Sequence, residues 1–197
     1  MHFPSITNLL LIALATWTAA SPINLEKRGD IVVGFRRVSK EQAEEYNKKG
    51  LYFDHDFEMW GKQIGKGVYT SPSRDEYEQL SDPKNWYCVI KSPSHSFASI
   101  PKAWIPEKNP SNQKRLWNQL TESHIDEYVK GLGEDPDKAL RLSIMPHGRD
   151  RTRTQMLIVP DLATHKHFSV RCYEKKEDVK EGRVDYGAWG VKGEKGT

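Results

Sequence analysis

Hydrophobic and polar positions follow a strand-like pattern and then a helix-like one at the start of the folded region. Residues 30–38, DIVVGFRRV, are β-branched and apolar before they become basic, which predicts a first strand. A helix is expected directly after it, because Ser39 can cap its start, Gln42 stands at the capping-box position and Gly50 can end it. The chain is therefore expected to open with a strand and a helix.

Later apolar runs predict further strands. Short β-like runs stand at 67–71 (GVYTS), 85–91 (NWYCVIK) and 167–174 (HFSVRCYE). Two more, 138–146 and 154–161, flank a polar stretch and predict a hairpin. Early helices combined with late strands indicate the α+β class.

The segments between these strands predict two more helices and two irregular regions. Helices are expected at 73–83 and at 113–133, the second with a break near Ser123 as the alternative to one continuous helix. Residues 51–65 lack a clean period and are expected to form a loop with one helical turn. Residues 99–113 are rich in proline and are expected to be irregular.

The N-terminus indicates a secreted protein. Residues 1–20 contain the apolar core NLLLIALATWTAA and end in small residues, which is typical of a signal peptide; a membrane anchor is the alternative. Residues 21–28 end in the pair Lys27-Arg28, which resembles a processing site of fungal secreted proteins, although two surface charges would look the same. Cleavage there would make Gly29 the first mature residue.

The remaining chain has the size of one domain. Cleavage after residue 28 leaves 169 residues (197 − 28), which can bury a core of their own. We expect a single, monomeric domain at 29–197 without a membrane anchor, because no second apolar run has membrane length. The charged, glycine-rich end, 175–197, is expected to be mobile, with Trp189 able to fold back.

Cysteine and charge content narrow the chemistry further. Cys88 and Cys172 both lie in strand-like runs, and an oxidising compartment favours a bridge between them over two separate buried thiols. The formal net charge of +3 is spread over mixed acids and bases, so nucleic acid is not the expected partner. No second histidine stands at ligand spacing from His55, so no metal site is expected.

The segment 64–73, IGKGVYTSPS, is the strongest local motif. A phosphate loop would need four residues between its first glycine and Gly-Lys, followed by a helix, and a dinucleotide fingerprint would need a strand before it. Neither condition is met. What remains is a glycine turn that delivers the aromatic Tyr69 and the hydroxyls of Thr70 and Ser71 onto a strand edge.

Three patches between residues 31 and 172 resemble the ADP-ribosyltransferase superfamily, which includes the heat-labile enterotoxin A chain and the poly(ADP-ribose) polymerases. VVGFRRVSKEQAEEYNKKGL resembles the early strand and helix, with Phe35 in the aromatic and Arg36 in the Arg/His position. GKGVYTSPS resembles the nicotinamide-pocket segment, and TQMLIVPDLATHKHFSV resembles the late strand. The resemblance implies a split β-sheet core with flanking helices.

The same resemblance implies NAD as substrate and assigns roles to single residues. Arg36 would hold ribose or phosphate, and the aromatic Tyr69 would stack on nicotinamide. Gly67 and Thr70 would complete the NAD site, while Ser71 would orient groups around the sugar. Arg36, Tyr69 and Ser71 are expected to line one cleft, with Gln155, near the expected position of the catalytic carboxylate, at its rim. Each also has a plain structural reading, as a strand-end charge, a strand aromatic, a turn residue or a surface amide.

The chain departs from the superfamily at the catalytic Glu. Alignment puts Met156, or Gln155, at this position, and neither carries the charge that stabilises the oxocarbenium-like transition state. Asp150 and Glu174 do not fit the spacing. Activity is therefore expected to be weak or lost.

Three functions follow from these observations. The first is a secreted fungal toxin or effector with mono-ADP-ribosyltransferase activity. The second is a catalytically inactive effector that binds a host protein. The third is a small secreted nuclease or RNA binder, in which His147 and the alternating arginines of HGRDRTR lie on one face of an extended chain.

Overall fold

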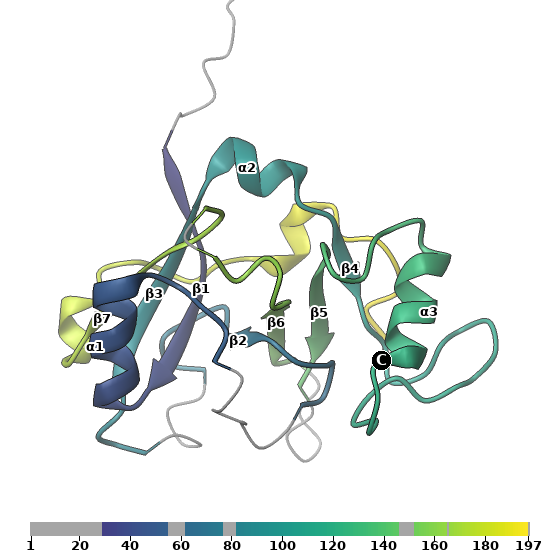
Figure 1. Cartoon of the computed structure of the whole chain (residues 1–197), viewed down its shortest axis with the longest axis horizontal. Coiled ribbons are helices and arrows are strands. Elements are labelled where there is room, and N and C mark those ends of the chain that lie inside the picture. Colours follow the sequence, from purple (N-terminus) through teal and green to yellow (C-terminus); the bar gives the residue numbers. More distant parts are fainter. Residues whose placement is uncertain (1–28, 55–61, 77–81, 146–151, 165, 197) are drawn as a thin grey trace, which may run out of the picture.

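A computed structural model describes residues 29–54, 62–76, 82–145, 152–164 and 166–196 of the chain. The strands are β1 (Asp30–Val38), β2 (Val68–Thr70), β3 (Trp86–Pro93), β4 (Lys102–Trp104), β5 (Leu140–Ile144), β6 (Thr154–Ile158) and β7 (Ser169–Tyr173). The helices are α1 (Lys40–Lys49), α2 (Ser94–Ser99) and α3 (Ser123–Gly131), with the short 3-10 helices η2 (Lys176–Asp178) and η3 (Tyr186–Trp189). The protein is α+β, as the sequence predicts (Figure 1).

The strands form two sheets that meet at one point. The first sheet has the order β1-β3-β7 and is antiparallel, and the second has the order β2-β6-β5-β4. In the second sheet only β4 and β5 run parallel. Phe35 and Ser71 exchange two backbone hydrogen bonds of 2.9 and 2.8 Å, so β1 joins the end of β2. Figure 1 shows α1 beside the first sheet and α3 beside the second.

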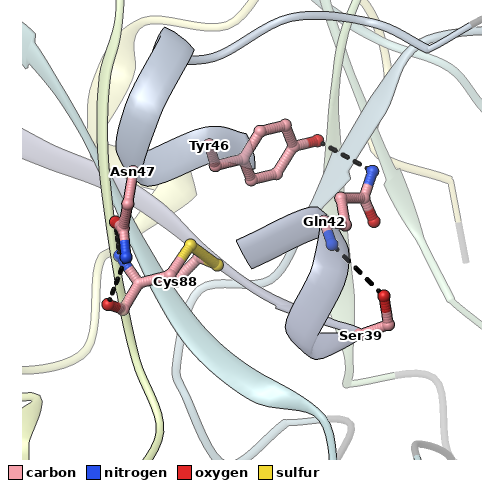
Figure 2. Close-up of a disulfide and its surroundings, with 6 residues drawn as sticks. Ser39, Gln42, Tyr46, Asn47 and Cys88 are labelled. Atoms are coloured by element: carbon pink, nitrogen blue, oxygen red, sulfur yellow. Dashed lines mark hydrogen bonds between the residues drawn. A yellow bond between two sulfur atoms is a disulfide. The ribbon is translucent and has the colours of Figure 1, made fainter. Parts of the chain in front are cut away.

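The predicted strand–helix opening is confirmed. The Ser39 hydroxyl accepts a hydrogen bond from the Gln42 amide (3.3 Å), and Gly50, at a φ of 84°, ends α1 with its own N–H on the Tyr46 carbonyl. The Gln42 side chain does not complete a capping box. Its amide nitrogen donates instead to the Tyr46 hydroxyl (3.3 Å), inside the packed face of the helix (Figure 2).

The predicted disulfide is confirmed. Cys88 on β3 and Cys172 on β7 are direct cross-strand partners and form the bridge, 84 residues apart in sequence. Asn47 of α1 pairs with the outer edge of β7 through two bonds with the Cys172 backbone, of 3.0 and 2.8 Å (Figure 2). The bridge and this amide together tie the first helix to two strands.

The segment 99–133 departs from its predicted structure in two places. Residues 102–104 form β4 inside the region expected to be irregular, and the helix begins only at Ser123, the position where a break was considered. Residues 113–122 form a loop, because Gln113 and Asn118 have positive φ and the Trp117 indole donates to the Ile105 carbonyl (2.9 Å). Helix α2 was not predicted.

Two other predictions meet the structure in part. The hairpin is confirmed, since β5 and β6 pair with Leu142 opposite Met156; its tip, 146–151, lies outside the described residues. Of the helix predicted at 73–83, residues 74–76 form a turn, while 77–81 lie outside the described residues.

The C-terminal segment, expected to be a mobile end, packs against both sheets. Val179 and Tyr186 are buried, and Trp189 packs on Phe97 with the ring centroids 4.6 Å apart, as its predicted return to the core requires. Lys192 adds two backbone hydrogen bonds to β4, of 2.9 and 2.8 Å. In Figure 1 this segment crosses from the β7 side to β4 in yellow.

Candidate functional site

The glycine segment is a turn closed by its own aromatic residue. Gly65 and Gly67 have φ of 110° and 149°, a conformation that favours glycine. The Tyr69 hydroxyl donates to the Gly65 carbonyl (2.8 Å) and accepts from the Ile64 amide (3.0 Å). Burial raises the pKa of this hydroxyl well above its ordinary value. The Tyr69 side chain therefore holds the turn rather than standing open to stack on a ligand.

A buried arginine supports the same turn from the second sheet. Arg141 on β5 is 2 % exposed and donates to the Ile64 carbonyl (3.2 Å) and to the carboxylates of Glu122 and Asp126. Glu122 in turn accepts from the Lys66 amide (2.7 Å). Burial raises the pKa of the Asp126 carboxyl, although the positive charge of Arg141 lowers it. Sequence reasoning missed Arg141, although a lone arginine in an apolar strand was a usable signal.

Arg36 lies close to the Tyr69 backbone. Arg36 is 8 % exposed on β1, and its guanidinium donates to the Tyr69 carbonyl (3.1 Å). Burial raises the pKa of the Tyr46 hydroxyl, and the positive charge of Arg36 acts in the opposite direction. A cavity of about 10 Å³ is lined by Arg36 and Ser71 among others, which is too small to hold an organic ligand.

The two predicted hydroxyls are engaged within the protein. Thr70 Oγ1 donates to the Met156 carbonyl (3.2 Å) and lies 3.1 Å from the Tyr186 hydroxyl. Ser71 Oγ lies at hydrogen-bond distance from the carbonyls of Phe35 (3.2 Å) and Ser73 (2.7 Å). Gly67 approaches β6 so closely that an added Cβ would lie 2.3 Å from a backbone oxygen. Ser71 thus contacts the first sheet, whereas Thr70 and Gly67 contact β6 within the second sheet.

Gln155 lies on the opposite face of the second sheet from the residues that face β1. Strand alternation and the pairing of Tyr69 with Leu157 place Gln155 on the α3 side, whereas Met156, opposite Thr70, faces the first sheet. Gln155 is 5 % exposed and donates to Gln63 and Ser143, both at 3.0 Å. Arg36 therefore meets the backbone of Tyr69 and lines a small cavity with Ser71, whereas the Tyr69 side chain lies on the α3 face of the sheet, as Gln155 does.

On β6, the residue whose side chain faces β1 is uncharged. Met156 is fully buried in a core cluster that also contains Val33 and Cys88 of the first sheet. No residue of β6 ionises, and Glu174 is exposed beyond the end of β7. Asp150, the other proposed substitute, lies outside the described residues.

The remaining predicted features give no further site. His147, Arg149 and Arg151 lie outside the described residues, so the nuclease interpretation stays a prediction. Within the described ranges, no three His, Cys, Asp or Glu side chains gather as a metal site would require. Over the same ranges, no helix has the length and apolar character needed to cross a membrane.

Comparison with known proteins assigns the chain to a family. Residues 62–194, from just before β2 to the end of the packed C-terminal segment, match a family described as "Family of unknown function (DUF5910)". The chain belongs to this family. No curated protein matches it.

Proposed function

We propose that this chain is a secreted effector protein with an ADP-ribosyltransferase-like fold that acts by binding a target and does not transfer ADP-ribose. The observation that carries the proposal is Met156, which occupies the β6 position facing β1. Transfer needs a carboxylate beside the cation that develops as nicotinamide leaves. A buried thioether supplies no such charge.

The likeness to the transferases is supported by order and proximity. The order of the elements along the chain matches that of the superfamily: Arg36 on β1 comes first, helix α1 follows, and then come residues 69–71 and the late strand β6. Arg36 donates to the Tyr69 carbonyl at 3.1 Å, although the two residues are 33 positions apart. Secretion is supported by the apolar N-terminal segment and by the Cys88–Cys172 bridge.

The hydrogen bonds that the site residues make argue against NAD as a tightly bound ligand. Arg36, Thr70 and Ser71 already make hydrogen bonds within the protein, so NAD would have to compete with them. We therefore expect NAD, the candidate ligand, to bind weakly or not at all. A host protein is the class of target that remains.

Nicotinamide release tests the proposal directly. Wild type incubated with NAD should release no nicotinamide above a protein-free blank, with NAD affinity measured in parallel by calorimetry. Gln155→Glu should also stay at background, because its carboxylate would face Gln63 and Ser143 and not Arg36. Release by wild type that Arg36→Ala abolishes, and that the exposed control Arg115→Ala retains, would overturn the proposal in favour of an active transferase.

A further inference from the structure

A separate pocket lies between the second sheet and the C-terminal segment. It has a volume of about 390 Å³ and is lined by residues of β4, of the start of β6 and of the C-terminal segment. The lining residues are Trp104, Thr152, Thr154, Arg183, Val184, Asp185, Tyr186, Gly187 and Lys195. Arg36, Tyr69 and Ser71 are not among them. The volume is within the range of small-molecule sites.

The C-terminal wall of the pocket is fixed in place. The Val184 amide donates to the Pro72 carbonyl (2.8 Å), and the Tyr186 hydroxyl lies 3.1 Å from Thr70 Oγ1. The Tyr186 ring packs on Trp189 with the centroids 5.0 Å apart. The pocket is therefore preformed, so a ligand would not have to order this wall on binding.

Two cations, Lys195 and Arg183, stand in the lining. Lys195 Nζ lies 5.3 Å from the centroid of the Trp104 ring, and no carboxylate lies within ion-pair distance of Lys195 in the part of the chain that the structure describes. Arg183 donates to Glu76 through Nη1 (2.8 Å), and a guanidinium has further N–H donors. Both side chains are exposed at the pocket and can meet an anion.

Two carboxylates limit how much negative charge the pocket accepts. Asp185 is the acidic residue of the lining, and its Oδ1 accepts from the Gly187 amide (2.8 Å). Glu76 offsets part of the charge of Arg183. A single negative charge fits this balance better than a phosphate dianion, because like charges at close range repel.

The other walls add hydroxyls and limited apolar surface. Val184 contributes an aliphatic side chain and Thr152 and Thr154 contribute hydroxyls, while the rings of Trp104 and Tyr186 are only 6 % and 2 % exposed. Hydroxyls can orient a carboxylate. From size, charge and lining, we infer that this pocket binds a small organic monocarboxylate, with its carboxylate at Lys195 and Arg183. This inference goes beyond the proposed function and does not depend on it.

Four probes and three variants test this inference. 3-Phenylpropionate is compared with phenethylamine, benzyl alcohol and phenyl phosphate, and binding is followed by amide NMR shifts. 3-Phenylpropionate should bind most tightly and shift the amides of Thr154 and Gly187. Lys195→Gln and Arg183→Gln should each weaken it by about 10-fold, the loss expected for one charge-assisted hydrogen bond. Lys180→Gln, an exposed lysine outside the lining, should change nothing.

Each possible outcome bears on a different part of the inference. Equal affinity for benzyl alcohol or phenethylamine would overturn the inferred role of charge, and tighter binding of phenyl phosphate would overturn the choice of a monoanion. No binding by any probe, shifts confined to other parts of the protein, or equal losses in Lys180→Gln and Lys195→Gln would overturn the site itself. None of these measurements involves NAD, so failure here leaves the proposed function standing.

Discussion

The two sheets are stabilised in different ways. In the first sheet, apolar residues of β1 and β3 pack under α1, and a disulfide joins β3 to β7. The second sheet buries polar groups on its α3 face, where Arg141, Ser143 and Gln155 are each at most 5 % exposed. Both faces are buried, yet the first sheet depends on a covalent link and apolar contacts, whereas the second holds a network of buried hydrogen bonds around Arg141 and Gln155.

This difference indicates how each half should respond to change. Apolar packing loses stability in proportion to the atoms removed. A buried polar network behaves otherwise, because the loss of one member leaves its partners without hydrogen bonds in a medium where they cannot find water. The second sheet should therefore be the more sensitive to a single substitution.

The largest effect is expected at the centre of the polar network. Arg141→Ala should lower the free energy of unfolding by about 3–5 kcal/mol, because the Ile64 carbonyl and two carboxylates lose a buried donor. Glu122 and Asp126 are partly exposed, which favours the lower end of this range. Urea unfolding measures the change. Arg115→Ala, whose pair with Glu107 is exposed at 3.9 Å, is the control and should cost less than about 1 kcal/mol. Equal effects would contradict the role given to the buried network around Arg141.

Loss of the disulfide should come next. The double variant Cys88→Ala/Cys172→Ala should be destabilised by about 2–4 kcal/mol, since the bridge closes a loop of 84 residues in the unfolded chain. Wild type unfolded in the presence of a reductant should match the variant. The effects of this variant and of Arg141→Ala should add, because they lie in separate sheets. A wild-type stability that the reductant leaves unchanged would contradict the role given to the bridge.

The smallest effect concerns the pH dependence of stability. It tests a buried cation, Lys102, at the edge of the second sheet. Lys102 is 7 % exposed and donates to the carbonyls of Phe97 and Ile100, both at 2.7 Å. Burial lowers the pKa of its ammonium group below 10.5 in the folded protein. The unfolded chain then binds more protons between the lowered pKa and 10.5, so stability rises with pH in this window.

A methionine at this position gives the reference. The stability of wild type minus that of Lys102→Met should increase as pH rises toward 10.5, while all other groups titrate alike in both proteins. Urea midpoints at neutral pH and at pH values approaching 10.5 measure this difference. A difference that stays constant or falls would show that burial does not disfavour the charged form of Lys102.

Residues 64–73 show what a local sequence pattern can and cannot predict about function. The sequence predicted a glycine turn that leads Tyr69 into a strand, and this is confirmed. It did not reveal that the Tyr69 hydroxyl bonds back to Gly65, or that Arg141 supports the turn from 77 residues away. The difference matters, because an aromatic residue committed to its own turn is not a ligand-stacking surface.

The sequence by itself determined the features whose signals lie within a few residues. The Ser39 cap and Gly50 define α1, the paired apolar runs define the β5–β6 hairpin, and two cysteines in strand-like runs define the bridge. These depend on local propensity and on a small number of possible partners.

Only the tertiary structure decided the rest. Residues 113–122 have a helical apolar pattern, but the Trp117 indole binds the Ile105 carbonyl and the segment stays a loop. The face on which Gln155 lies depends on strand register, and a shift of one residue would exchange it with Met156. The C-terminal segment is polar in composition and mostly exposed, yet the buried side chains of Tyr186 and Val179 hold it against the sheets. In each case a long-range hydrogen bond or packing contact outweighed a local preference, because helix propensities differ by less than about 1 kcal/mol per ordinary residue and a buried contact can exceed that.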